Sequence, residues 1–313
     1  MTPIIEVAGL TKRYRKATEN AVDGISFTVA PGEFFALLGP NGAGKTTTIS
    51  VLTTTLSPTS GTAVIAGHDV RRDASLVRRD VGIIFQRPSL DLNLTAEENV
   101  RFHAILYGLY PWRPTFSLMP AVYRRQVGEL AGLLGIEKVI FKPLRTFSGG
   151  MKRKLEIMRS LLHRPKALFL DEPTAGLDVP SRRALWDHLA KVRRESGTTV
   201  FLTTHYIEEA EEADHICILD HGRIVSFGTP EEVKAHLLQQ YLLIDAADRT
   251  ALRAELARLG IPFSDGPLVR VNLDGRSAHA VLKAIDVPLT VVKTHAPSLE
   301  DAYLEIVSRQ VAS

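Results

Sequence analysis

Short, almost purely apolar runs recur along the chain between residues 34 and 220, and amphipathic stretches separate several of them. Strands that are apolar on both faces are typical of a parallel sheet covered by helices. The pattern therefore predicts an α/β domain with a mostly parallel sheet. The runs are FFALLG (34–39), VGIIFQ (81–86), ALFLDEP (167–173), TTVFLTTH (198–205) and HICILD (215–220).

The stretch from about 88 to 160 shows no strand pattern and predicts a helical insert. TAEENVRFHAILYGL predicts a helix that Thr95 caps, with Glu98 completing a capping box. VYRRQVGELAGLLGI predicts a second helix. Between them, the prolines of LYPWRPTFSLMP (109–120) predict a loop, because proline stops helices. The aromatic side chains of this loop either contact a partner or pack on the loop itself.

The pattern changes after about residue 235. QYLLIDAA, LVRVNLD and LTVVKTHA predict strands, and DRTALRAELARLG and GRSAHAVLKAI predict helices between them. SLEDAYLEIVSRQ predicts a closing helix. This order predicts a small ferredoxin-like α+β domain. We therefore expect two domains, 1–234 and 235–313.

The composition excludes several classes of protein. The 38 basic and 35 acidic residues give a net charge of only +3, which is not typical of a dedicated nucleic-acid binder. Cys217 is the single cysteine of the 313 residues, so no internal disulfide forms, and we expect a small buried hydrophobe. No apolar run reaches the roughly 18 residues of a membrane span, and no secretory signal is evident.

The stretch GPNGAGKTT (39–47) fits the pattern G-x-x-x-x-G-K-[ST] between a predicted strand and a predicted helix. Glycines let backbone N–H groups approach phosphates, and the helix N-terminus adds a positive dipole end. Lys45 is expected to reach the β- and γ-phosphates, and the Thr46 hydroxyl to bind Mg²⁺. We expect nucleotide phosphates to lie against Gly39, Pro40, Asn41, Gly42, Ala43, Gly44, Lys45, Thr46 and Thr47.

Two acidic residues, Asp171 and Glu172, end the apolar run of ALFLDEP. An aspartate at a strand end can hold the shell of a Mg²⁺ ion, and the neighbouring glutamate can polarise an attacking water. In isolation such a pair is commonly solvated. Its combination with the phosphate loop favours a catalytic site.

The stretch TFSGGMKRKLEIMRSLLHRP places Ser148, Gly149 and Gly150 at the start of a helix, which is a second anion-binding helix terminus. On its own this pattern indicates only a helix cap. Lys152, Arg153 and Lys154 follow; we expect them on a solvated face, and additional attraction of phosphate is the alternative. The apolar face of the helix is formed by Met151, Leu155, Met158 and Leu162.

Together these motifs resemble the ATP-binding cassette (ABC) ATPases, the nucleotide-binding subunits of ABC transporters, over about residues 4–235. GPNGAGKTT resembles the Walker A loop, ALFLDEP the Walker B motif, and FSGGM the ABC signature, which commonly begins with Leu and ends with Gln. The other matches are the D-loop (TAGLD, with Asp178), the Q-loop (Gln86), the switch histidine (His205) and the position of the aromatic residue that stacks on adenine (Tyr14).

The resemblance implies a P-loop NTPase fold with an antiparallel N-terminal β part and a helical signature subdomain. It also implies ATP and Mg²⁺ as cofactors and a head-to-tail dimer, in which Ser148 and Gly150 contact the ATP held by the partner chain. The expected catalytic residues are Glu172, His205 and Gln86. The expected metal ligands are Thr46, Gln86 and Asp171.

The resemblance further implies a separate transmembrane permease and a location at the cytoplasmic face of the membrane. The tail HAPSLEDAYLEIV resembles the ATPases of prokaryotic drug, antibiotic and polysaccharide exporters. A soluble ABC ATPase acting on ribosomes or nucleic acid is the alternative, although such proteins typically carry two cassettes in one chain. Chromosome and repair ATPases insert a long coiled coil, and no heptad tract lies between residues 45 and 148. A regulator without turnover is disfavoured by Glu172 and His205.

Overall fold

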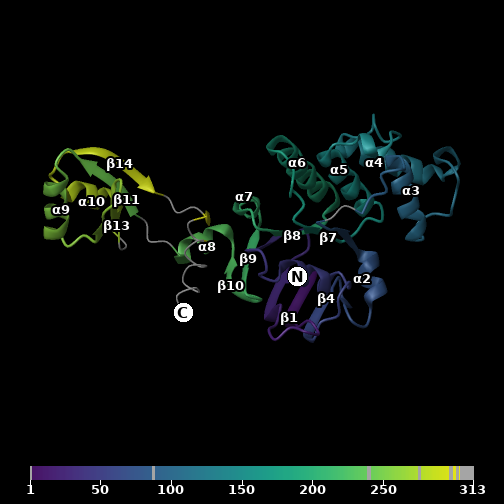
Figure 1. Ribbon diagram of the computed structural model, residues 1–313, viewed down its shortest axis with the longest axis horizontal. Helices are drawn as coiled ribbons and strands as arrows, with labels where there is room; N and C mark the ends of the chain where they lie inside the picture. Colours follow the sequence, from purple (N-terminus) through teal and green to yellow (C-terminus); the bar gives the residue numbers. More distant parts are fainter. Residues whose placement is uncertain are drawn as a thin grey trace. The chain divides into compact units, whose positions relative to one another are not determined.

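The computed structural model describes residues 2–86, 89–237, 241–273, 276–295, 299, 300 and 303. The chain divides into two compact units, residues 1–229 and 230–313 (Figure 1). The first unit holds two sheets and most of the helices, and the second holds one sheet with its own helices.

A six-stranded sheet organises the first unit, and its strands lie in the order β10-β9-β3-β8-β7-β6. The five strands from β9 to β6 pair in parallel, and β10 is antiparallel to β9. The predicted mostly parallel sheet is thereby confirmed, and Cys217 is buried in β9. The strands are β3 (Phe34–Leu38), β6 (Val81–Ile84), β7 (Ala167–Asp171), β8 (Thr199–Thr204), β9 (His215–Asp220) and β10 (Arg223–Gly228).

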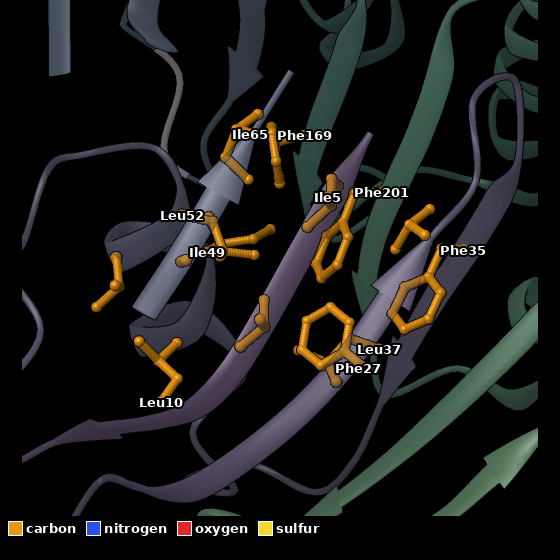
Figure 2. Packing of buried hydrophobic residues seen from close by; sticks show 14 of the residues in the cluster. Ile5, Leu10, Phe27, Phe35, Leu37, Ile49, Leu52, Ile65, Phe169 and Phe201 are labelled. Atoms are coloured by element: carbon orange, nitrogen blue, oxygen red, sulfur yellow. The ribbon is translucent and has the colours of Figure 1, made fainter. Parts of the chain in front are cut away.

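An antiparallel sheet lies beside it, in the order β2-β1-β4-β5. Its strands are β1 (Ile5–Lys12), β2 (Val22–Val29), β4 (Ser60–Ile65) and β5 (His68–Asp69). Both sheets and α1 (Lys45–Leu52) contribute to one hydrophobic core (Figure 2). Phe35 stacks on Phe27 and on Phe201 at centroid distances of 5.2 and 5.1 Å. These aromatic contacts join the two sheets behind the loop that follows β3.

A group of helices forms the predicted insert. The capping box of α3 (Ala96–Leu106) is present as predicted, with the Thr95 hydroxyl accepting from the Glu98 backbone N–H. α3 and α4 (Ala121–Leu134) pack against α5 (Gly149–Leu161), and α5 packs against α6 (Val179–Ser196). The insert also contains the 3₁₀ turns Phe116–Leu118 and Leu144–Thr146, and outside it the first unit has the short helices α2 (Ala74–Asp80) and α7 (Ile207–Ala210).

The loop between α3 and α4 packs largely on itself and on its neighbours. Tyr110 donates a hydrogen bond to Gln126 and lies edge-on to Tyr123, and the Phe116 ring also meets Tyr123. Trp112 is different, because 60% of its surface is exposed. Of the loop aromatics, Trp112 is therefore the one whose ring is largely available to a partner.

The second unit contains an antiparallel sheet in the order β12-β13-β11-β14. The short strand β12 was not predicted, since its two residues are too few to show an alternating pattern. The predicted closing helix lies mostly outside the described residues. The elements are α8 (Pro230–Leu237), β11 (Tyr241–Ala246), α9 (Arg249–Arg258), β12 (Phe263–Ser264), β13 (Val269–Asn272), α10 (Ala278–Ala284) and β14 (Leu289–His295).

Candidate active site

The loop between β3 and α1 needs glycine at both of its ends. A Cβ on Gly39 would lie 2.3 Å from the Leu219 carbonyl oxygen, and one on Gly44 would lie 2.3 Å from that of Ala21. Gly44 also has a φ of +107°, which residues with a Cβ rarely adopt. The close approach of neighbouring backbone therefore explains why this turn contains glycine at these positions.

Lys45, the first residue of α1, folds back over this loop. Its Nζ donates to the carbonyl oxygens of Gly39 (2.7 Å) and Pro40 (3.0 Å) and lies 3.8 Å from a Glu172 carboxylate oxygen. Burial lowers the pKa of Lys45, while the nearby charges of Glu172 and Asp171 act in the opposite direction. The sequence thus places one buried cation at the start of a helix, where a phosphate group would also lie.

Asp171 ends β7 between two hydroxyl groups. The Thr203 hydroxyl donates to Asp171 Oδ1 at 2.6 Å, and the Thr46 hydroxyl donates to the same atom at 3.3 Å. Burial raises the pKa of Asp171, and the hydrogen bond from Thr203 opposes this shift. Thr46 and Asp171, predicted as metal ligands from distant parts of the sequence, are therefore neighbours.

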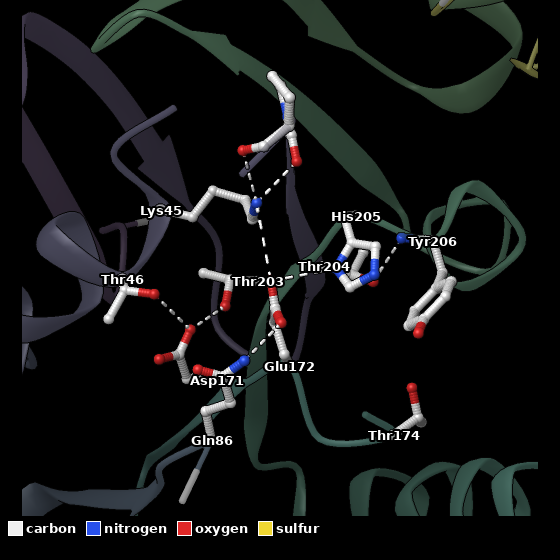
Figure 3. A network of polar contacts seen from close by, with 12 residues as sticks. Lys45, Thr46, Gln86, Asp171, Glu172, Thr174, Thr203, Thr204, His205 and Tyr206 are labelled. Atoms are coloured by element: carbon white, nitrogen blue, oxygen red, sulfur yellow. Dashed lines mark hydrogen bonds and ion pairs between the residues drawn. The ribbon is translucent and has the colours of Figure 1, made fainter. Parts of the chain in front are cut away.

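Glu172 lies at the centre of the polar network (Figure 3). Its carboxylate accepts a hydrogen bond from Gln86 Nε2 at 2.9 Å, and it lies 3.1 Å from His205 Nδ1. Its φ is +46°, an uncommon value for a residue with a side chain, and its N–H donates to the Thr203 carbonyl oxygen. The three residues predicted to be catalytic are thus brought together from three separate segments.

Most of these residues line one cavity of about 520 Å³, but Asp171, which is hydrogen-bonded to Thr46, is not among the lining residues. The predicted site residues that line it are Asn41, Gly42, Gly44, Lys45, Thr46, Thr47, Gln86, Glu172 and His205. Tyr14 is not among the lining residues, although its hydroxyl lies 3.2 Å from that of Thr47. The cavity combines a phosphate-type loop, a buried lysine, the Glu172 carboxylate and the amide side chains of Asn41 and Gln86.

The predicted signature residues lie elsewhere in the chain's own fold. Ser148 caps α5 by accepting from the Met151 N–H, and a Cβ on Gly150 would meet Ser181 Oγ at 3.0 Å. Asp178 is exposed and caps α6 by accepting from the Ser181 N–H. The starts of α5 and α6 therefore pack on each other, and neither contributes to the lining of the cavity.

The expectation that Arg153 lies on a solvated face is wrong. Only 6% of its surface is exposed, because the face of α5 opposite the apolar stripe is buried as well. On that face Arg153 and Ser160 donate to the carbonyl oxygens of Phe85 and Ile83. Charged and hydroxyl side chains opposite an apolar stripe normally face water. The spacing of apolar residues in this helix therefore could not predict that Arg153 and Ser160 bind backbone carbonyl oxygens.

Glu209 is a second residue that the sequence pattern did not single out. Its buried carboxylate accepts hydrogen bonds from the hydroxyl groups of Thr174 and Thr204. Burial raises the pKa of Glu209, and these two hydrogen bonds oppose the shift. Thr174 follows Glu172 by two residues and Thr204 precedes His205, so Glu209 links the two segments that hold the network.

Comparisons with known proteins decide the family. A family model described as ABC transporter matches residues 22–175. The chain is 38% identical to the daunorubicin/doxorubicin resistance ATP-binding protein DrrA of Streptomyces peucetius, over 97% of this chain and 92% of that protein. The chain belongs to the ATP-binding subunits of ABC transporters. It is also 36% identical to the Nod factor export ATP-binding protein I of Ralstonia nicotianae, over 99% and 95% of the two chains.

Solved structures of ABC cassettes share the fold. The structure of an ATP-binding subunit of an ABC transporter matches with a TM-score of 0.64 and 31% identity, over 74% of this chain and 92% of that one. A dimeric post-hydrolysis state of the cassette MJ0796 bound to ADP and Pi matches with a TM-score of 0.63 and 26% identity, over 72% and 98%. The chain therefore has the ABC cassette fold, binds ATP and hydrolyses it as an ATPase.

Proposed function

We propose that this ATPase drives export through a separate membrane permease, and that Glu172 orients the water that attacks the γ-phosphate. The observation that carries the catalytic assignment is the convergence of Lys45, Gln86 and His205 on the Glu172 carboxylate. A carboxylate held among hydrogen-bond partners at a phosphate loop is placed to accept a proton from water. Gln86 and His205 fix the direction in which it points.

In this proposal the nucleotide phosphates lie along the loop from Gly39 to Thr47, where Lys45 exchanges its carbonyl contacts for phosphate oxygens. Tyr14 lies beside Thr47 at the edge of the loop and stacks on the adenine. Stacking on its ring suits a flat, aromatic base. His205, which lines the same cavity, contacts the γ-phosphate.

The oxygen atoms of Thr46 and Asp171 fit a Mg²⁺ ion, because this ion prefers oxygen ligands and uses few protein groups beside phosphates and water. The hydrogen bond from the Thr46 hydroxyl to Asp171 Oδ1 supports this proposal, because it holds the two side chains next to each other. Gln86 is the third proposed ligand. When bound, Mg²⁺ would neutralise charge on the β- and γ-phosphate oxygens.

A head-to-tail dimer would explain why the signature residues lie outside the cavity of their own chain. Ser148 and Gly149 are exposed at the start of α5, where backbone N–H groups favour an anion. We propose that Ser148, Gly149, Gly150 and Asp178 face the nucleotide of a second copy. A related cassette is described as dimeric in its ADP- and Pi-bound structure.

Export through a permease is supported by the relatives and by the surface. Two relatives are named for drug resistance and for Nod factor export. Phe102 and Leu106 are exposed apolar side chains one turn apart on α3, the exposed Tyr107 directly follows this helix, and Phe85 is exposed beside Gln86. Neighbouring exposed apolar side chains, such as those at the end of α3, mark protein interaction sites. We propose that the permease docks here, which places the chain at the cytoplasmic face of the membrane.

The substitution Glu172→Gln tests the catalytic assignment. Turnover should fall about a hundredfold or more, while ATP affinity is retained, because Lys45 and the loop are intact. The variant should then accumulate as an ATP-bound dimer in size-exclusion chromatography with ATP. Glu195→Gln, on the exposed face of α6, is the matched control and should behave as the unmodified protein. Normal hydrolysis by Glu172→Gln would refute the role of Glu172.

A further inference from the structure

A buried ion pair on α5 lies outside the residues assigned above. Arg153 and Glu156 are 6% and 2% exposed, and Arg153 Nη1 donates to Glu156 Oε2 at 2.9 Å. Taking two charges out of water is costly unless further hydrogen bonds satisfy them. The other hydrogen bonds of Arg153 and Glu156 therefore show which segments this pair holds in place.

Arg153 binds the backbone on both sides of Glu172. Its Nε donates to the carbonyl oxygen of Pro173 at 2.8 Å, and its Nη2 donates to that of Asp171 at 3.3 Å. The residue between them has the left-handed φ of +46°. Such a conformation persists only where the surroundings hold it in place. The guanidinium supplies that hold from the adjacent helix.

The same pair also binds the segment that carries Gln86. Arg153 Nη1 donates to the carbonyl oxygen of Phe85 at 2.7 Å, and Glu156 Oε1 accepts from the N–H of Ser89 at 3.1 Å. Gln86 in turn donates to Glu172. Arg153 thus contacts the backbone beside both partners of that hydrogen bond.

We propose that Arg153, held by Glu156, is a positioning residue for ATP hydrolysis. It fixes the backbone at Glu172 and Gln86, so that the Glu172 carboxylate keeps its direction in the cavity. Arg153 uses four of its five N–H groups on four different acceptors. Only a planar guanidinium offers donors in that spread, and a lysine ammonium does not. The inference rests on the proposed role of Glu172.

If the ion pair between Arg153 and Glu156 only stabilised the fold, its loss would have a different effect. Loss of a fold-stabilising contact lowers the amount of folded enzyme, so nucleotide-binding sites and total activity fall together. Loss of a positioning contact lowers the turnover of each site while nucleotide affinity stays. Measuring turnover per site separately from the number of nucleotide-binding sites therefore distinguishes a positioning role from a structural role.

The substitution Arg153→Lys in the full chain tests the proposal. Turnover per nucleotide-binding site should fall about tenfold or more, with sites counted by equilibrium ATP binding, and the ATP dissociation constant should change less than about twofold. Arg125→Lys, at an exposed position on α4, is the matched control and should leave both values unchanged. A normal turnover per site in Arg153→Lys, or a loss of sites alone, would overturn the proposal.

If Arg153→Lys does not fold, Glu156→Gln provides the second variant. It keeps an oxygen acceptor for Ser89 but removes the charge that holds Arg153, so turnover per site should fall at unchanged affinity. Unchanged turnover would again overturn the proposal. Glu172→Gln, measured in parallel, distinguishes failure of the catalytic assignment from failure of the positioning role. If Glu172→Gln hydrolyses ATP normally, the catalytic assignment fails. If only the Arg153 and Glu156 variants hydrolyse ATP normally, the positioning role alone fails.

Discussion

Glu172 shows how much of the site follows from neighbouring residue types and how much requires the fold. Its acidic character and its place after an apolar run identified it from the sequence. Its left-handed backbone and its contacts with Gln86 and His205 depend on segments 86 and 33 residues away. No local pattern encodes such contacts, because they arise only when the parallel strands align their carboxyl ends at one sheet edge.

Lys45 carries a prediction at this scale. The substitution Lys45→Ala removes the buried ammonium that we place against the phosphates, so ATP affinity should fall at least about tenfold, or roughly 1.4 kcal/mol. Titration calorimetry with ATP measures this change. Lys191→Ala, half-exposed on α6 and 3.9 Å from Glu195, is the control. Unchanged affinity in Lys45→Ala would contradict the assignment of the phosphate loop.

The types of the secondary-structure elements were predicted well where the local sequence signal was unambiguous. The five apolar runs are the five parallel strands, and the capping box of α3 is formed by the residues expected to form it. The prediction was wrong for α5, where we expected the apolar face to be buried and the opposite face, which carries Arg153, to be solvated. α5 packs on both faces, and only tertiary structure reveals that Arg153 meets backbone carbonyls instead of water.

The contact between α3 and the end of α5 makes stability depend on pH. The His103 and Tyr107 rings are tilted against each other with centroids 4.2 Å apart, and His103 Nε2 has no hydrogen-bond partner among the residues that the structure describes. Burial, with the nearby charges of Arg159 and His163, lowers the pKa of His103 to about 3. Between the ordinary histidine pKa of 6.5 and this lowered pKa of about 3, the unfolded chain therefore binds a proton that the folded chain does not.

Stability should accordingly be complete above about pH 6.5 and fall between there and about pH 3, by up to about 1.4 kcal/mol per pH unit for this group. His103→Phe keeps the ring contact without the titration, so its free energy of unfolding should fall less steeply between pH 7.5 and 5.5. Urea unfolding, followed by the fluorescence of Trp112 and Trp186 in the first unit, measures both slopes. Identical slopes would show that His103 does not carry the effect.

At the scale of the whole molecule, the chain combines an ATPase site with exposed apolar side chains of the kind that bind other proteins. No helix within the described part of the chain is long and apolar enough to cross a bilayer. The exposed aromatic and aliphatic side chains of α3 and the loop after it lie in the same unit as the ATP cavity. These exposed side chains fit the proposal that the ATPase acts on a membrane protein supplied by another chain.

Copurification tests that account most directly. The tagged chain would be extracted from membranes of its native host in mild detergent, purified, and its companions identified by mass spectrometry. We predict a stoichiometric membrane protein with several spans, lost when Leu106 and Tyr107 are both replaced by serine. Ribosomal proteins or nucleic acid in place of any membrane partner would contradict the transport account and favour a soluble ABC ATPase.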